Sequence, residues 1–224
     1  MPDDREDSMT VRKYRERLLA DPYRPAYHFC VPDSDGRPGD PNGCFFAQGR
    51  HHLMYLYLRE RKEYCWGHVS STDLVHWRHH PDALCAGGKD DGCFSGGAFV
   101  DDDGTAYLTF WIYNRNKTDL GSDAGIAIAS SQPPYDMWTR QSSVAIPSTA
   151  WGIREKNGVP LGCADPSNIW KSDGKYYMLT GNLCVLNQFG RTADSPRHLR
   201  GDWTELFVSE DLERWIYQGR FYQR

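Results

Sequence analysis

Short runs of β-branched and aromatic residues, separated by Gly, Asp and Pro, make up most of the chain after residue 24. Runs of this length, bounded by turn-forming residues, are typical of β-strands. Clear examples are HHLMYLYL (51–58), TAYLTFWIY (105–113), GIAIASS (125–131) and KYYMLTG (175–181). A helical pattern is convincing over residues 9–20, with Ser8 as its N-cap. Because helical patterns are otherwise scarce, the sequence predicts an all-β fold rather than alternating βαβ units.

The strand pattern repeats three times around one turn. Three segments carry a glycine nine positions after their first residue, and the pairs are Asp40 and Gly49, Ser95 and Gly104, and Asp165 and Gly174. Each unit then closes on a segment that ends in Trp, and two of these segments, 71–77 and 209–215, share the pattern S-x-D-L-x-x-W. Repeated units of three or four short antiparallel strands are typical of β-propeller blades.

The repeat therefore predicts an incomplete β-propeller domain over residues 24–224, behind a charged N-terminal segment, 1–23, that carries the short helix. Its three consecutive blades are expected at about residues 40–90, 91–147 and 160–219.

The start of each unit carries a polar residue that the repeat brings to one axis. In a propeller the innermost strand of each blade lines the central channel, so Asp40, Ser95 and Asp165 should face one another. Asp40 lies in PGDPNGC (38–44), where two glycines and a proline predict a sharp turn. An aspartate that only bonds its own backbone in a turn is the alternative. Two carboxylates that converge in an aromatic funnel suit glycosyl transfer, because they serve an oxocarbenium-like transition state.

Composition removes several other functions. The 224-residue chain has a net charge of −4 and therefore lacks the basic footprint of a nucleic-acid-binding protein. It contains no apolar run near the ~20 residues that span a bilayer. Residues 1–23 are charged and contain no apolar core of a signal peptide, which favours a cytoplasmic protein. The aromatic content of 13% suits either a core or a sugar cleft.

Metal binding is not expected from the sequence. The seven cysteines, at positions 30, 44, 65, 85, 93, 163 and 184, show no C-x-x-C spacing, so we expect reduced and mostly packed thiols without a zinc site. The pairs His51–His52 and His79–His80 also suggest no chelation, because neighbours on a strand point to opposite faces.

Three motifs in order resemble glycoside hydrolase family 32, the group of invertases, levanases and inulinases. They are DPNG at 40–43, WGHVSSTDLVHW at 66–77 and CFSG at 93–96, and the likeness extends from about Arg24 to the C-terminus. The resemblance implies a five-bladed propeller, of which this chain holds about three blades. It also implies retaining hydrolysis of β-fructofuranosides such as sucrose, fructo-oligosaccharide or fructan, with no cofactor and a carbohydrate as the partner.

The resemblance also implies roles for single residues. Asp40 matches the nucleophile, and Asp165 matches the aspartate that binds the fructosyl hydroxyls and stabilises the transition state. The positions that line the fructose pocket correspond to Asn42, Trp66, Phe94 and Ser95. Without the resemblance, Trp66 and Phe94 would be interpreted as core residues and Ser95 as a turn residue.

The chain departs from the family pattern at three positions near the expected site. Ala164 stands where the family has arginine before the aspartate, Leu56 replaces a glutamine, and Gly39 replaces the asparagine before the nucleophile. Each change removes a polar contact. These losses keep open a non-catalytic fructan- or sugar-binding propeller fragment, and a related propeller enzyme such as an arabinofuranosidase or a fructosyltransferase.

The family's acid/base glutamate lies in an E-C-P motif that does not occur in this chain. We therefore expect a truncated sequence, whose ring is completed by a missing C-terminal half or by a second chain. Glu155 is a weak substitute for the acid, because nothing fixes its position. The other three glutamates near the third unit are expected to be surface charges, namely Glu205, Glu210 and Glu213.

Overall fold

The computed structural model describes residues 20, 22–23, 37–59, 63–86, 92–113 and 124–224. The helix predicted over residues 9–20 lies outside these residues, apart from Ala20. Within the described ranges, long antiparallel strands dominate and the helical segments are short. The prediction of an all-β fold is confirmed. No helix among the described residues is long and apolar enough to cross a membrane.

Three antiparallel sheets follow one another along the chain, and within each the strands are paired in chain order. The first contains β1 (Arg37–Ala47), β2 (Arg50–Arg59), β3 (Glu63–Ser71) and β4 (Arg78–Cys85). The second contains β5 (Gly92–Val100), β6 (Ala106–Tyr113), β7 (Gly125–Ser131) and β8 (Thr139–Arg140), with β9 (Ile146–Pro147) also on β7. The third contains β12 (Trp170–Ser172), β13 (Lys175–Gly181), β14 (Trp203–Ser209) and β15 (Trp215–Gln223).

Two smaller features accompany the third sheet. A hairpin of β10 (Ile153–Lys156) and β11 (Val159–Gly162) precedes it. Between β13 and β14 the chain forms three short helical segments, α2 (Leu183–Val185), η1 (Leu186–Gly190) and η2 (Arg197–Leu199). The sequence pattern did not predict this helical insertion.

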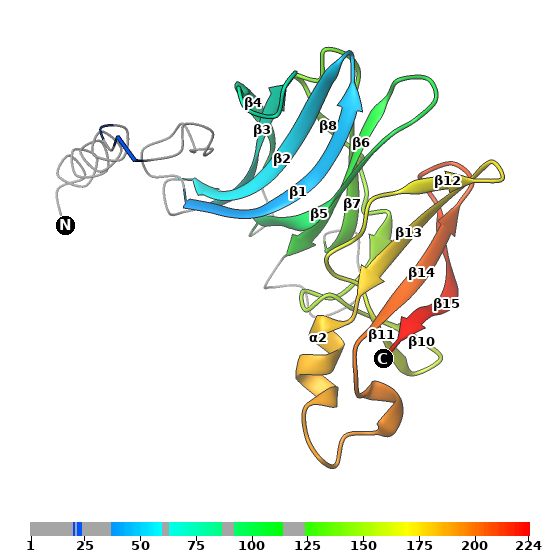
Figure 1. Cartoon of the computed structure of the whole chain (residues 1–224). Coiled ribbons are helices and arrows are strands. Elements are labelled where there is room, and N and C mark those ends of the chain that lie inside the picture. The colour runs from blue at the N-terminus through cyan, green and yellow to red at the C-terminus, as the bar shows by residue number, and fades with distance from the viewer. Residues whose placement is uncertain (1–19, 21, 24–36, 60–62, 87–91, 114–123) are drawn as a thin grey trace.

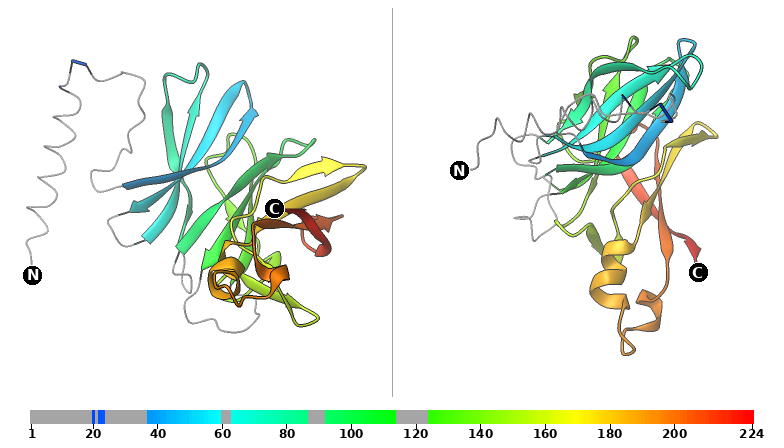
Figure 2. Two further views of the ribbon diagram at one scale, coloured as in Figure 1. Left: turned by 60° about the horizontal axis from the view of Figure 1, so that its bottom comes forward. Right: turned by 60° about the vertical axis from the view of Figure 1, so that its left-hand side comes forward.

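The sheets stand side by side in chain order, and β1 of the first lies next to β5 of the second (Figures 1 and 2). Apolar side chains fill the space between neighbouring sheets. The first cluster joins the first two sheets and includes Met54, Trp66, Leu108 and Phe110. The second joins the second and third sheets and includes Ile126, Ile128, Met178, Phe207 and Trp215. The core is therefore a series of layers between sheets.

The repeated sequence motifs form repeated turns. Gly49, Gly104 and Gly174 all have a positive φ, between 71° and 85°, in the turn between the first two strands of each sheet. The two S-x-D-L-x-x-W segments form the same set of hydrogen bonds. In each, the serine Oγ accepts from the backbone N–H groups two and three residues on, and the aspartate Oδ1 accepts from the next two. One local sequence thus forms one local structure twice.

The innermost strands pack backbone against backbone. A Cβ on Gly43 of β1 would lie 2.3 Å from the backbone N of Ala98 in β5. A Cβ on Gly97 of β5 would lie 2.4 Å from the backbone N of Asn168, just before β12. Both separations are far shorter than a carbon–nitrogen contact allows, so neither position accepts a side chain without moving a neighbouring strand.

Glu205 corrects an expectation from the sequence. It was expected at the surface with Glu210 and Glu213, but its side chain is completely buried on β14. Its carboxylate accepts hydrogen bonds from Trp203 Nε1 at 2.6 Å and from the Tyr217 hydroxyl at 2.8 Å. Arg220 Nε lies 4.0 Å away. The expectation was wrong because the typical exposure of glutamate ignores neighbours that can satisfy a buried carboxylate.

Replacement of Gly43 by alanine should destabilise the fold by about 1–3 kcal/mol, as overpacking of a tight contact does. The control is Gly181→Ala, since a Cβ there has its nearest contact at 3.6 Å, from Ala164 O. Urea unfolding of both variants measures the difference. Equal stability of the two variants would show that β1 and β5 are not in close backbone contact.

Replacement of Glu205 by alanine should also destabilise the protein, because two donors lose their acceptor at about 1–3 kcal/mol each. Glu213→Ala is the matched control, since Glu213 is exposed. Thermal unfolding compares the two variants. A loss of stability no greater than that of Glu213→Ala would show that the Glu205 carboxylate is not buried with these two donors.

Candidate active site

Asp40 lies within a distorted part of β1. The pairing of β1 with β2 is irregular between Pro38 and Pro41, and again between Pro41 and Cys44. The predicted sharp turn is therefore wrong: residues 38–44 belong to a strand, and the glycines and proline cause bulges in it. Pro41 has no N–H to contribute to a ladder, so a bulged position suits it. Asp40 is exposed at this distortion.

Ser95 brings the second sheet into contact with Asp40. It lies on β5 where the pairing with β6 is irregular, between Phe94 and Gly96. Its hydroxyl donates a hydrogen bond of 2.7 Å to Asp40 Oδ2. The two residues are 55 positions apart in the chain. This bond orients one carboxylate oxygen and leaves the other available.

Asp165 precedes β12 in a left-handed conformation, with a φ of 47°. Aspartate is among the few residues that adopt this conformation readily, and such positions often occur at functional sites. Part of the residue is exposed. Burial of its carboxyl group, and then the negative charge of Asp40, raise its pKa. The two carboxylates are therefore close enough for their charges to repel one another.

Hydrogen bonds hold the segment after Asp165 against the second sheet. Asn168 Oδ1 accepts from the Ala98 backbone N at 2.9 Å. Thr109 Oγ1 donates to Ser167 O at 3.0 Å and accepts from the Gly97 backbone N at 3.1 Å. Sequence reasoning missed these positioning residues. The available signal was that Asn168 follows Asp165 by the same three positions that separate Gly43 from Asp40.

The remaining predicted site residues differ in their surroundings. Asn42 is 9% exposed, and its Nδ2 is a buried donor without a partner among the described residues. Phe94 is half-buried and its ring contacts Tyr64, Trp111 and Tyr113. A role for Asn42 and Phe94 in substrate binding stays a prediction.

Trp66 occupies the position of a core residue. It is 0% exposed and lies opposite Leu56 across the β2–β3 ladder, with Phe110 against its ring. Its Nε1 has no hydrogen-bond partner among the described residues. The side chain presents no open surface among the described residues. Its role in the lining of a sugar pocket stays a prediction.

The three departures from the family pattern also have clear positions. A Cβ on Gly39 would lie 3.6 Å from Leu56 Cβ, so the two replaced residues are neighbours beside Asp40. Ala164 is 1% exposed, and a Cβ on Gly152 would lie 2.9 Å from its Cβ. A longer side chain at position 164 in this packing would have to displace that neighbour.

Cys184 was not predicted as a site residue. It lies in α2, and a Cβ on Gly152 would meet its Sγ at 3.2 Å. Burial, and then the charge of Asp165, raise the pKa of the Cys184 thiol to about 11. The thiol is therefore protonated at neutral pH and adds no charge beside Asp165.

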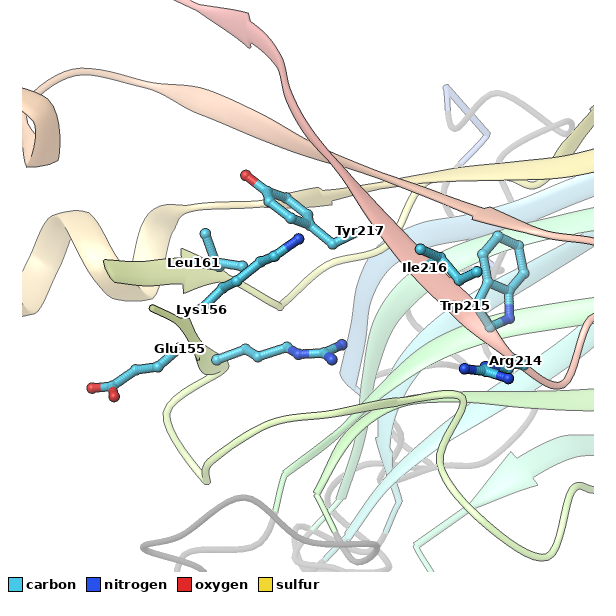
Figure 3. A pocket seen from close by; sticks show the side chains of 8 residues that line it. Glu155, Lys156, Leu161, Arg214, Trp215, Ile216 and Tyr217 are labelled. Atoms are coloured by element: carbon cyan, nitrogen blue, oxygen red, sulfur yellow. The ribbon is translucent and has the colours of Figure 1, made fainter. Parts of the chain in front are cut away.

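Glu155 lines a pocket of its own. A pocket of about 330 Å³ is formed between the β10–β11 hairpin and the start of β15. Figure 3 shows its lining, in which the carboxylate of Glu155 points away from Trp215 and Tyr217. None of Asp40, Ser95 and Asp165 lines this pocket. A role for Glu155 as the acid gains no support from its position.

Comparison with known proteins adds the family. Residues 34–224 match the family model described as the glycosyl hydrolases family 32 N-terminal domain. A sucrose-6-phosphate hydrolase of Klebsiella pneumoniae is 31% identical over 214 residues, 93% of this chain and 40% of that protein. A fructan 6-exohydrolase of Beta vulgaris is 30% identical over 207 residues, 89% of this chain and 31% of that protein. The chain thus spans 40% or less of the length of these two relatives.

Solved structures of the same kind share the fold. The sucrose-6-phosphate hydrolase from Lactobacillus gasseri matches with a TM-score of 0.66 at 24% identity, over 95% of this chain and 39% of that one. Fructan 1-exohydrolase IIa from Cichorium intybus matches with a TM-score of 0.61 at 23% identity, over 88% and 34%. The predicted β-propeller is confirmed, and its described sheets do not close a ring.

Removing the charge of Asp40 should lower the pKa of Asp165. Asp40→Asn eliminates the repulsion that disfavours the ionised form, so Asp165 should lose its proton at a lower pH than in the wild type. The carboxyl carbon resonances, followed by NMR through a pH titration, measure this. The exposed Asp194→Asn is the control. An unchanged Asp165 titration in Asp40→Asn would mean that the two carboxylates do not share a site.

Proposed function

The chain belongs to glycosyl hydrolase family 32, whose N-terminal domain it contains, and we propose that it carries the fructosyl-binding part of a site that hydrolyses β-fructofuranosides with retention. The observation that carries the proposal is the meeting of three units of the repeat. Ser95 of the second unit donates a hydrogen bond to Asp40 of the first. The negative charge of Asp40 raises the pKa of Asp165, which belongs to the third unit. Most glycoside hydrolases use a pair of carboxylate residues at the scissile bond.

Asp40 is the proposed nucleophile. One oxygen of its carboxylate attacks the anomeric carbon of the fructosyl unit, and the bond from that carbon to the leaving oxygen breaks with its electron pair on the oxygen. Water then attacks the same carbon and passes its proton to the conjugate base of the group that protonated the leaving oxygen, and the bond to Asp40 breaks with its electron pair returning to the carboxylate. The Ser95 hydrogen bond to Oδ2 holds the carboxylate in one orientation, so that Oδ1 is presented for attack.

Asp165 is the proposed transition-state stabiliser. Its negative charge would oppose the positive charge that develops on the fructosyl ring, and its oxygens would accept hydrogen bonds from ring hydroxyls. The hydrogen bonds of Asn168 and Thr109 fix the segment that presents it. Asn42 Nδ2, which has no partner among the residues that the structure describes, is a donor that a sugar hydroxyl would satisfy.

The proton for the leaving alkoxide must come from another group. Glu155 lines a separate pocket, and the buried Glu205 carboxylate accepts a hydrogen bond from Trp203 in the core. We propose that the general acid lies outside the described residues, in further polypeptide that completes the propeller or in a second chain. The greater length of the relatives supports the former.

The substrate class is proposed from the relatives. They include sucrose-6-phosphate hydrolases, a fructan 6-exohydrolase and a raffinose invertase of Escherichia coli, which is 32% identical over 164 residues. The substrate in each of these three names is a fructoside. Leu56 and Gly39 make the surroundings of Asp40 less polar than the family pattern, so we expect weaker hold on the fructosyl hydroxyls.

The second candidate is a sugar-binding protein without turnover. Its support is the packing of Ala164, which puts no guanidinium at the position before Asp165, together with the apolar Leu56.

A cytoplasmic location stays our proposal. Its support is that five of the described cysteines are free thiols, at positions 44, 65, 85, 163 and 184.

An activated substrate separates these candidates. β-Fructofuranosyl fluoride has a leaving group that needs little protonation, so the chain should release fluoride without a general acid. Sucrose should react about 10²–10⁴-fold below the rate of an enzyme with its acid in place. Asp40→Ala should release no fluoride above background, whereas the exposed Asp194→Ala should match the wild type. An ion-selective electrode measures the release.

Two results would contradict the proposal. If Asp40→Ala released fluoride at the rate of the wild type, Asp40 could not be the nucleophile. Fructose binding by calorimetry in a wild-type chain that releases no fluoride would favour the sugar-binding alternative.

A further inference from the structure

Two groups of potential metal ligands lie on the first sheet, and neither includes Asp40. One joins Cys65 of β3 with Asp82 and Cys85 of β4, and the other joins His52, His68 and His80 of three neighbouring strands. In each group the candidate ligand atoms lie within 4.8 Å of one another. Both are assembled across strands, so the spacing of cysteines and the pairs of adjacent histidines did not reveal them.

The cysteine group comes together through the register of the sheet. Cys65 and Cys85 are directly opposite one another in the β3–β4 ladder. The Cys65 and Cys85 sulfur atoms lie within 4.8 Å of one another. Cys85 Sγ lies 3.6 Å from Asp82 Oδ2. Two sulfur atoms and one carboxylate oxygen therefore face one point.

The separation of Cys85 Sγ and Asp82 Oδ2 matches one edge of a tetrahedral zinc site. Zn–S bonds of about 2.3 Å and Zn–O bonds of about 2.1 Å, at the tetrahedral angle, place S and O about 3.6 Å apart. They place two sulfur atoms about 3.8 Å apart. The Cys85–Asp82 distance already has this value. A divalent cation would therefore enter with little movement of Cys85 and Asp82, and the two sulfur atoms, within 4.8 Å of one another, would need to move by no more than about 1 Å to reach the zinc separation.

The charges around the group favour a cation. Two thiolates, Asp82 and the neighbouring Glu63 would carry four negative charges. Arg59, which is 3.4 Å from Asp82 Oδ2 and also pairs with Glu63, carries one positive charge, so a divalent cation would leave one net negative charge. The Tyr57 hydroxyl donates to the same oxygen at 2.6 Å. Asp82 is thus held by outer partners, as metal-ligating carboxylates are.

The histidine group is less suited to a metal, because four of its six ring nitrogens already bond other side chains, and only His52 Nε2 and His68 Nδ1 lack a partner among the described residues. His52 Nδ1 and His68 Nε2 share a hydrogen bond of 2.8 Å. His80 uses one nitrogen for Ser70 Oγ at 2.7 Å and the other for Asp136 Oδ1 at 2.6 Å. A metal there would have to break several of these bonds. We interpret this group as a buried hydrogen-bond network that joins the first sheet to Asp136 of the second.

We propose that Cys65, Asp82 and Cys85 bind a divalent zinc-type cation, with the fourth position open to water or another ligand. The site is accessible, since Cys85 is half-buried and the Asp82 side chain is 28% exposed. Such an ion would pin β4 to β3 at one end of the first sheet. Because the folded register brings the ligands together, binding should stabilise the native state.

Zinc and cobalt titrations of the untagged, metal-free chain test the proposal, with a phosphine reductant to keep the thiols reduced. One equivalent of Co²⁺ should produce the near-ultraviolet thiolate-to-cobalt absorption, and Zn²⁺ should displace it. Cys85→Ser should lower the affinity more than about 100-fold, since even outer partners of a metal site are worth about 10–100-fold. Asp82→Asn should weaken binding while the thiolate absorption remains.

Two matched variants serve as controls. Cys44→Ser removes an exposed thiol on β1 and His80→Asn disrupts the histidine group, and neither should change the cobalt spectrum. Zn²⁺ should also raise the thermal unfolding temperature of the wild type but not of Cys85→Ser. Absence of stoichiometric binding, or binding that survives in Cys85→Ser, would overturn the proposal. Loss of binding in His80→Asn alone would assign the metal to the histidines instead.

Discussion

The close backbone packing of the innermost strands is the constraint on which the candidate site depends. Gly43 lets β1 approach the backbone of Ala98, and Gly97 lets the segment at Asn168 approach β5. Side chains at these positions would push the sheets apart and lengthen every distance between them. The Ser95–Asp40 bond and the electrostatic coupling of Asp40 with Asp165 require that approach. The glycine in the DPNG motif is thus a packing requirement for the aspartate three residues before it.

Much of this architecture could be predicted because local sequence determines local structure here. The turn glycines 49, 104 and 174 adopt the positive φ that their position in the repeat requires, and the two S-x-D-L-x-x-W segments form the same turn. The alternation of apolar and polar residues then separates the strands. The order of the strands within each sheet follows from short connections, which favour pairing of neighbours in the chain.

What could not be predicted depends on contacts between distant residues. The exposure of Glu205 was misjudged because its partner Tyr217 lies on the neighbouring strand β15, whose register with β14 the sequence alone does not define, while Trp203 lies two residues before it on the same strand. The stretch 38–44 looked like a turn because glycine and proline also mark bulges, and only pairing with β2 distinguishes the two. The Cys65–Cys85 pair is invisible to any search along the chain, since it exists only across a ladder. Asn168 and Cys184 belong to the same class of cross-strand or cross-loop neighbours.

The departures around Asp40 and Asp165 have one electrostatic consequence. In the family pattern an arginine precedes the second aspartate, and such a neighbour would favour the ionised carboxylate. Here Ala164 takes that place in tight packing, and both influences on Asp165, burial and the charge of Asp40, raise its pKa. An aspartate stabilises a positive transition state only when it is ionised, so the acid limb of any activity should lie at higher pH than with an arginine in place. The same loss removes a fork of hydrogen-bond donors to sugar hydroxyls. If the proposed roles hold, the absence of that guanidinium should weaken sugar binding and transition-state stabilisation together, because one side chain would have served both.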